Sequence, residues 1–166
     1  MNVTIEPVTA ANWRSTLSLG VHTQQQRFVA GFAPISAIAL AKAYVGAGGS
    51  TWAPQLIRAD GIPVGFVALT TKPEAPGECW VMHFFIDREH QGRGIGRAAM
   101  VELIAHVRGM REPVERVLLT VHPENVVAQR LYAALGFVPS GEMLEGEPVF
   151  VLLLSPRAGR RQPLIP

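Results

Sequence analysis

Apolar and polar residues alternate in several short stretches of the chain, and these stretches predict strands. Residues 3–8, "VTIEPV", alternate as a half-buried strand does. Residues 54–70 hold two apolar segments joined at Asp60-Gly61, a pair favoured in tight turns, which predicts a hairpin. Residues 79–87, "CWVMHFFID", are apolar on both faces, so we expect a strand at the centre of a sheet.

The rest of the chain combines helical spacing with two further strand regions. Residues 116–121, "RVLLTV", predict a buried strand, and residues 137–155 predict a closing hairpin that turns near Glu145-Gly146. Thr9 and Thr23 are candidate helix caps, and Pro34 is expected to interrupt the helical region around it. Helices are expected over residues 10–19, 24–30, 35–45, 94–108 and 124–135.

The order of these elements predicts the fold class. A strand, then helices, then antiparallel strands, then strand–helix–strand–helix–strand is typical of an α/β (α+β) sandwich. We expect one domain over residues 1–155, with a mixed, mostly antiparallel central sheet flanked by helices. Residues 156–166 form a basic tail that we expect to be disordered.

Composition and charge exclude two classes of protein. Apolar residues make up 48% of the chain and charged residues 17%, which excludes a disordered chain. The formal net charge is +2, but three basic residues lie in the last ten positions: Arg157, Arg160 and Arg161. The rest of the chain therefore has no basic excess, and we expect no nucleic-acid partner.

The cellular compartment is suggested by the single cysteine and by the N-terminus. Cys79 stands alone, which excludes an internal disulfide framework and fits a reducing compartment. The N-terminus lacks the pattern of a signal peptide, and the least charged stretch, residues 28–41, contains Pro34 and is shorter than the roughly 20 residues of a membrane span. We expect a soluble, cytoplasmic protein with no membrane partner and no metal site.

Glycines at positions 92, 94 and 96 stand where a helix is predicted to begin, although each costs about 1 kcal/mol of helix stability relative to alanine. The first turn of a helix leaves backbone N–H groups unpaired, and glycine lets an oxyanion approach them. Three arginines flank this turn: Arg88, Arg93 and Arg97. The pattern indicates a phosphate or pyrophosphate cradle, with a merely flexible loop as the alternative.

Two common phosphate-binding motifs do not fit this segment. A P-loop ends in Gly-Lys-Ser/Thr, whereas Gly96 is followed by Arg97-Ala98-Ala99. A Rossmann fingerprint that starts at Gly92 would need a third glycine at position 97, which is arginine. A nucleotide-binding protein of the P-loop type is therefore disfavoured.

The chain resembles the GCN5-related N-acetyltransferases (GNAT family) in two segments at the family's spacing. The first fits the motif Q/R-x-x-G-x-G/A after a strand: Gln91-Gly-Arg-Gly94-Ile-Gly96. The second fits N-x-x-A-x-x-L-Y-x-x-x-G-F: Asn125-Val-Val-Ala128-Gln-Arg-Leu131-Tyr132-Ala-Ala-Leu-Gly136-Phe137. Residues 12–30, 41–45 and 59–69 look like the bacterial spermine/spermidine (polyamine) acetyltransferase branch.

This resemblance implies acetyl transfer from acetyl-CoA to an amine. The backbone of the glycine turn would hold the diphosphate of the cofactor, which assigns Gln91, Gly92, Arg93, Gly94, Ile95, Gly96 and Arg97 to cofactor binding. The pantetheine arm would pair with the backbone of the preceding strand at Phe84, Phe85 and Ile86. Asn125 has two readings, a helix N-cap or a contact to the pantetheine arm, and both can hold.

The resemblance also gives Tyr132 a catalytic role, as the acid that protonates the leaving thiolate; the alternative is a core aromatic. The general base stays open. Some family members use a glutamate early in the central strand, where this chain has Trp80, and the remaining candidates are Glu78, His83 and His122.

The sequence leaves several classes of acceptor open. A polyamine needs anionic partners, and five carboxylates are candidates: Asp87, Glu89, Glu142, Glu145 and Glu147. Residues 24–28 would line the acceptor site if the polyamine branch applies. The alternatives are another amine (an amino acid, an aminoglycoside-type drug or a protein N-terminus) and a non-catalytic CoA-binding sensor. Family members are often dimers, and the "VLLL" strand is a candidate for an edge contact.

Overall fold

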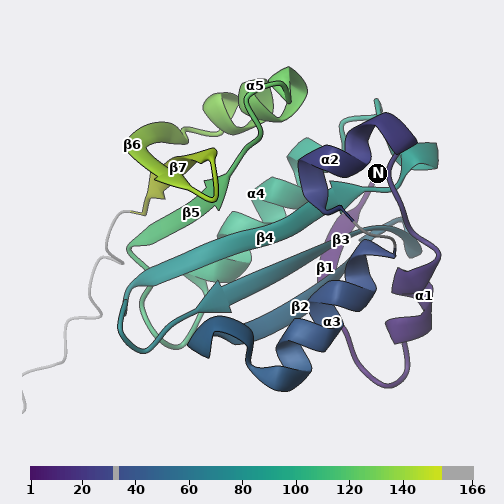
Figure 1. The fold of residues 1–166 in the computed structure, drawn as a ribbon. Coiled ribbons are helices and arrows are strands. Elements are labelled where there is room, and N and C mark those ends of the chain that lie inside the picture. The colour runs from purple at the N-terminus through teal and green to yellow at the C-terminus, as the bar shows by residue number, and fades with distance from the viewer. Residues whose placement is uncertain (32–33, 155–166) are drawn as a thin grey trace, which may run out of the picture.

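The fold is a single seven-stranded sheet with helices on both faces (Figure 1). The computed structural model describes residues 1–31 and 34–154, so the tail at 156–166 lies outside the described residues. Within those two ranges, no helix is both long and apolar enough to cross a membrane.

The sheet is mixed and mostly antiparallel, as the sequence predicts. Its strand order is β1-β2-β3-β4-β5-β7-β6, and only the central pair, β4 with β5, is parallel. The strand from the doubly apolar segment therefore lies at the centre of the sheet. The strands are β1 (Val3–Pro7), β2 (Thr51–Ala59), β3 (Ile62–Thr71), β4 (Glu78–Ile86), β5 (Arg116–Thr120), β6 (Val138–Leu144) and β7 (Glu147–Leu153).

The helices divide between the two faces of the sheet. In Figure 1, α3 lies in front of β2 and β3, and α4 lies behind the sheet. The α-helices are α1 (Trp13–Leu17), α2 (Gln26–Val29), α3 (Ile35–Val45), α4 (Ile95–Arg108) and α5 (Val126–Ala134). Three short 3-10 turns are η1 (Thr23–Gln25), η2 (Ala47–Gly49) and η3 (Arg88–His90).

Each face of the sheet has its own apolar core. The core under α4 is the larger one and includes Met100 and Leu103 from that helix, which are almost completely buried. The core under α3 contains Ile35 and Ala39 of that helix against Leu56 and Phe66 of the sheet. Each large apolar side chain buried in this way contributes about 1.5–3 kcal/mol to folding.

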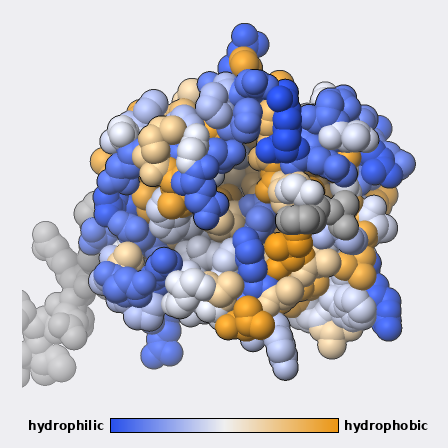
Figure 2. Space-filling model, viewed as in Figure 1, coloured by the Kyte–Doolittle hydropathy of each residue, from blue (hydrophilic) through white to orange (hydrophobic). Residues whose placement is uncertain are grey.

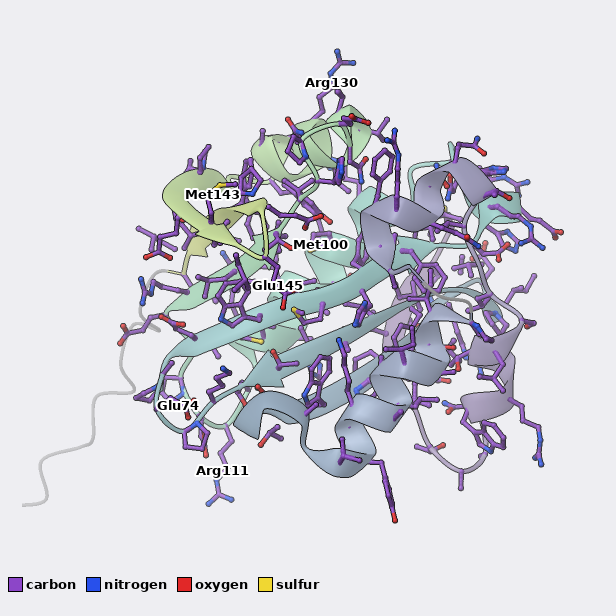
Figure 3. The ribbon with its side chains drawn as sticks, in the orientation of Figure 1. Glu74, Met100, Arg111, Arg130, Met143 and Glu145 are labelled. Carbon is purple, nitrogen blue, oxygen red and sulfur yellow. The ribbon has the colours of Figure 1, made fainter. Side chains whose placement is uncertain are left out.

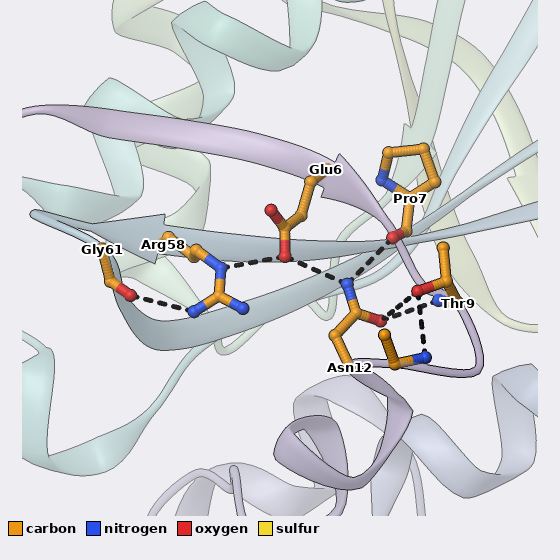
Figure 4. Close-up of polar contacts among 7 residues, drawn as sticks. Glu6, Pro7, Thr9, Asn12, Arg58 and Gly61 are labelled. Carbon is orange, nitrogen blue, oxygen red and sulfur yellow. Dashed lines mark hydrogen bonds and ion pairs between the residues drawn. The ribbon is translucent and has the colours of Figure 1, made fainter.

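The first helix is shorter than the pattern of residues 10–19 predicts, because a polar network holds its start (Figure 4). Asn12 precedes α1, and its side-chain Nδ2 donates to Glu6 Oε1 at 3.0 Å, while its Oδ1 accepts from the Thr9 backbone N–H at 2.7 Å. Arg58 Nε also donates to Glu6 Oε1, at 2.9 Å. Thr9 is therefore part of a turn before the helix rather than its cap.

Of two other predicted helix boundaries, one differs by a residue from the structure and one agrees with it. Thr23 is the first residue of η1, and His22 is the capping residue before it, so the expected Thr23 cap is wrong by one position. Pro34 stands directly before α3 and separates it from α2, as predicted.

The central strands β4 and β5 separate part-way along their length. Their parallel pairing covers only the start of β4, from Glu78 to Trp80, and the second half of β4 has no β5 partner. On its other edge β4 stays paired with β3 up to Ile86. The sheet therefore opens between β4 and β5, in front of the N-terminus of α4.

Candidate active site

A cavity of about 770 Å³ occupies the gap between β4 and β5. It is lined by α2, the second half of β4, the glycine turn at the start of α4, the end of β5, α5 and the β6–β7 turn. Figure 2 shows the surface hollowed near the centre of this face, between the β6–β7 hairpin and α2. The cavity joins segments that are far apart in the sequence, as expected for a binding site.

A bulge in β4 shapes the wall of the cavity. Across the β3–β4 pair, Phe66 faces Phe85 and Ala68 faces Met82, so His83 and Phe84 together oppose a single residue of β3. His83 has a φ of +54°, which is uncommon for a residue other than glycine. A bulge bends the strand and re-aims its side chains, so this one turns β4 away from β5.

The glycine turn presents bare backbone to the cavity. Gly92 and Gly94 have φ values of +75° and +77°, and Gly94 is the capping residue of α4. No side chain caps the first turn of α4, and no acidic residue lies in it. By contrast, Asn125 caps α5 by accepting from the Ala128 N–H at 3.2 Å. The start of α4 therefore fits an anion such as a diphosphate, which would pair with its free N–H groups and with the helix dipole.

The other residues of this turn have varied environments. Ile95 is buried in the core, whereas Arg97 is exposed and lines the cavity. Arg93 is exposed, and its Nη2 donates to the Glu89 carbonyl oxygen at 3.0 Å. Gly96 has an ordinary backbone conformation, and an added Cβ would make only normal contacts there.

Gln91 is held by three hydrogen bonds of its side chain. Its Nε2 donates to the Ile86 carbonyl at 2.9 Å, and its amide exchanges two hydrogen bonds with that of Gln25, each 3.0 Å long. Gln91 therefore ties the end of β4 to η1. Its backbone remains beside the cavity, whereas its side chain has a structural role in this conformation.

The three β4 residues predicted to pair with pantetheine all line the cavity. Phe85 directs its ring into the core, where it lies 6.1 Å from the Phe66 ring, so only its backbone can serve a ligand. The Ile86 carbonyl already accepts from Gln91. Phe84, next to the bulge and half-buried, is the most available of the three.

Tyr132 lies in the wall of the same cavity. It is buried, and its ring packs 5.7 Å from that of Phe137 at the end of α5. Burial raises the pKa of the Tyr132 phenol above its usual value, because the charged phenolate is poorly solvated there. The hydroxyl is therefore protonated at neutral pH, as a general acid requires. Asn125 lines the cavity as well as capping α5.

The three candidate bases are not equivalent. Glu78 lies at the far end of β4, where it forms an ion pair with Arg116, and it does not line the cavity. His122 does not line the cavity either, and its Nδ1 accepts from the Glu124 N–H at 3.1 Å. His83 is the only one of the three in the cavity wall, and its Nε2 lies 3.4 Å from the Lys42 ammonium nitrogen. An ammonium at that distance leaves His83 poorly placed to accept a further proton.

The family comparison supports this arrangement. The family model described as "Acetyltransferase (GNAT) family" matches residues 21–137, which include the glycine turn, β4, β5 and Tyr132. This chain belongs to the GNAT acetyltransferase family.

Individual relatives of known name share about a third of the matched residues with this chain. A spermine/spermidine N(1)-acetyltransferase of Bacillus subtilis (strain 168) is 35% identical over 98 residues, which cover 55% of this chain and 64% of the relative. An L-2,4-diaminobutyric acid acetyltransferase of Streptomyces avermitilis is 32% identical over 100 residues, which cover 60% of this chain and 55% of the relative. The chain thus spans less than two thirds of the length of the relatives it matches.

Solved structures share the GNAT fold. The crystal structure of a spermidine N-acetyltransferase from Vibrio cholerae, in complex with CoA and spermine, superposes with a TM-score of 0.68 at 18% identity. The match covers 90% of this chain and 92% of that one. At this identity the likeness establishes the fold, which is the mixed sheet that the sequence predicts.

Five carboxylates were candidates for holding an acceptor in this GNAT site, and they divide into two groups. Glu145 and Glu147 line the cavity from the β6–β7 turn, and Figure 3 shows Glu145 extending from that turn toward β4. Asp87, Glu89 and Glu142 do not line it. These three lie outside the cavity because Asp87 and Glu89 belong to the 3-10 turn after β4 and Glu142 is exposed on β6.

Asp87 has a structural role instead. The residue is 6% exposed, and its carboxylate accepts from the backbone N–H groups of Gly20 at 2.8 Å and of Glu89 at 3.0 Å. It therefore fixes the segment before η1 against the end of β4.

We expect Asp87→Ala to lower the free energy of unfolding by about 2 kcal/mol, because two partly buried backbone N–H groups lose a charged acceptor. Urea denaturation followed by circular dichroism measures this change. Glu89→Ala, at an exposed position of the same 3-10 turn, is the control and should change the free energy by less than about 0.5 kcal/mol. A loss below about 1 kcal/mol for Asp87→Ala would contradict the role.

The sequence reasoning missed one charged residue of the GNAT cavity, Lys42. Lys42 reaches the cavity from α3, and its ammonium lies 5.2 Å from the centre of the Trp52 ring. Trp52 in turn stacks on His83, with ring centres 6.2 Å apart. The available signal was the single charge in the otherwise apolar helix "ISAIALAKAYV".

Proposed function

We propose that this protein transfers the acetyl group of acetyl-CoA to a primary amine of a small molecule. The observation that supports it best is that three features surround one cavity. They are the uncapped glycine turn, the half of β4 that has no β5 partner, and the Tyr132 phenol. Membership of the GNAT family supports the same reaction. The thioester would supply an acetyl group activated for transfer, and the residues of this chain would bind, orient and protonate.

The backbone is suited to hold the donor in an extended form. Gly92, Gly94, Ile95, Gly96 and Arg97 line the cavity at the positive end of α4, where their N–H groups would hold an anion, and the Arg97 side chain adds a positive charge. The unpaired edge of β4 near Phe84 offers backbone groups to an extended amide-containing arm, as an added strand would use them. A donor held at both points would place its thioester beside the bulge.

The chemical step needs two proton movements. An alkylammonium with a pKa near about 10.4 is almost entirely protonated at pH 7, and only the neutral amine can attack a carbonyl. The ammonium first gives one proton to solvent. The neutral nitrogen then bonds to the acetyl carbon, the carbon–sulfur bond breaks, and the proton that the nitrogen loses restores the phenol that has protonated the sulfur. Tyr132 supplies a proton to the departing sulfur. General acid catalysis of this kind contributes about 10²–10⁴-fold to the rate.

A polyamine such as spermidine is one candidate acceptor. The spermine/spermidine relative and the two acidic residues at the β6–β7 turn, Glu145 and Glu147, support it. From the predicted segment 24–28, Gln25, Arg27 and Phe28 line the cavity. Arg27 forms a 2.6 Å ion pair with Glu124, which neutralises both charges on that side.

Two measurements test the proposal. Isothermal titration calorimetry with CoA should show 1:1 binding to the purified protein. Release of free thiol from acetyl-CoA, followed with a panel of polyamines, diamines, amino acids, aminoglycosides and peptide N-termini, should show turnover with at least one small amine. CoA binding without turnover of any amine would favour the alternative, a non-catalytic CoA sensor. A folded protein without affinity for CoA would refute both.

A further inference from the structure

The cavity wall formed by α3 and the β4 bulge carries a positive charge outside the residues proposed to hold the acetyl donor. Lys42 is half-buried there, with its ammonium over the Trp52 ring and 3.4 Å from His83 Nε2. It is separate from Arg97, which belongs to the glycine turn. In the part of the chain that the structure describes, no carboxylate lies within 4 Å of the Lys42 ammonium.

The nearest side chain to Lys42 is a neutral imidazole. His83 Nδ1 lies 3.3 Å from the Val29 carbonyl oxygen, which can only accept, so Nδ1 carries the proton and donates. Nε2 is then the acceptor for Lys42. Burial, and then the Lys42 charge, lower the pKa of His83, which keeps the ring uncharged at neutral pH. Lys42 thus has hydrogen-bonding and aromatic partners but no counter-charge.

We propose that Lys42 binds a carboxylate of the acceptor, so that the acceptor is an amino acid with two amines, of the 2,4-diaminobutyrate or ornithine type. This inference rests on the proposed acetyl transfer to a small amine. A half-buried ammonium without an anionic partner favours an incoming anion and disfavours an incoming cation. A polyamine carries only cationic groups, and none of them can lie against Lys42 without repulsion.

The opposite side of the cavity carries negative charge, so the two sides together form a dipolar site. Glu145 and Glu147 line it from the β6–β7 turn and provide negative charge for an ammonium of the acceptor. Arg27 and Glu124 also line the cavity, but they neutralise each other in their ion pair. The unpaired charges at the acceptor end are therefore one cation on α3 and two anions on the hairpin, which suits a zwitterion with an extra amine.

Matched pairs of ligands test this directly, because decarboxylation removes only the group in question. 2,4-Diaminobutyrate is compared with 1,3-diaminopropane, and ornithine with putrescine. Binding is measured by calorimetry with CoA rather than acetyl-CoA, so that no turnover occurs, and it is repeated without CoA. We expect the carboxylated member of each pair to bind at least about 10-fold more tightly, as a hydrogen-bonded charge pair provides.

Variants of Lys42 separate the charge from the shape of the side chain. Lys42→Met should weaken binding of the carboxylated ligands by about 10- to 100-fold and leave the diamines unchanged or tighter. Lys42→Glu should reverse the preference within each pair. Lys72→Met, at an exposed lysine after β3 that does not line the cavity, is the matched control and should change neither. Circular dichroism establishes that each variant is folded.

The outcomes separate this inference from the proposed function. Tighter binding of the diamines by the unaltered protein would overturn it, as would an equal loss of both ligand classes in Lys42→Met. Absence of binding by any member of the pairs, with and without CoA, would overturn it too. Thiol release and CoA binding are read separately, so a protein that binds diaminobutyrate through Lys42 without acetylating it would refute only the reaction.

Discussion

Replacing Tyr132 by phenylalanine is expected to lower kcat by about 10²–10⁴-fold while the affinity for CoA stays unchanged. The substitution removes only the hydroxyl, and the ring keeps its packing against Phe137. Because burial raises the pKa of the phenol, the hydroxyl remains protonated through neutral and mildly alkaline pH, ready to protonate a departing thiolate. The measurement is thiol release with the best acceptor from the panel, combined with calorimetry for CoA.

The control for this substitution is Tyr44→Phe, which makes the same chemical change at a residue that is 92% exposed. It should leave kcat and stability unaltered. If Tyr132→Phe keeps the unaltered kcat, the leaving thiolate needs no protein acid and Tyr132 is a core aromatic. If it loses CoA affinity as well, its role is in shaping the cavity rather than in proton transfer.

The arrangement of elements could be predicted because hydrophobic spacing records which faces are buried. β4 is apolar on both faces because helices cover both sides of the sheet at its centre, and the structure confirms that position. The Asp60-Gly61 turn joins β2 to β3 as expected, with both residues at positive φ. The short α1 was harder to predict, since its start depends on contacts of Asn12 with residues of β1.

The opening of the sheet could not be predicted in the same way. The bulge at His83 and Phe84 changes the backbone register by one residue, and neither residue type requires it. The sequences of β4 and β5 are both typical of buried strands, although the two strands pair only at one end. The separation follows from the fold as a whole, and it is what creates the cavity.

Within the candidate site, the sequence is most informative at positions where the backbone conformation requires a particular residue type. The positive φ values of Gly92 and Gly94 give a conformational reason for glycine at these two positions, and binding of a phosphate there stays a prediction. The roles of Asp87 and Gln91 escaped prediction because their partners, Gly20 and Gln25, lie more than 60 positions away in the sequence. Lys42 escaped for a similar reason, since it meets Trp52 and His83 only in the folded chain.

Substituting Gly94 by valine is expected to lower CoA affinity at least about 10-fold, since an L-residue in the left-handed region costs roughly 1–2 kcal/mol and the turn must move to relieve it. Gly94 has a φ of +77° and begins the helix whose N–H groups would hold the diphosphate. A β-branched residue is especially unfavourable in that conformation. Calorimetry with CoA on the folded variant measures the effect.

Gly96→Ala is the matched control for the glycine turn. Its added Cβ would lie 3.6 Å from Ile86 Cγ1 and 3.9 Å from Leu131 Cδ2, which are ordinary contacts. We therefore expect little change in CoA affinity, even though Gly96 lies two residues further into the helix than Gly94. Equal losses in the two variants would mean that the turn needs small residues for space rather than glycine for its backbone conformation.

A shorter ligand shows whether the lost affinity belongs to the diphosphate. Pantetheine carries the arm expected along β4 but lacks the diphosphate, so it has nothing to place on the N–H groups at the start of α4. Gly94→Val should therefore weaken CoA and leave pantetheine binding as it is in the unaltered protein. If both ligands weaken together, the substitution has disturbed β4 through Ile86 and Gln91, whose hydrogen bond joins the turn to that strand. Only a loss of CoA affinity with unchanged pantetheine affinity is consistent with a backbone that binds the diphosphate.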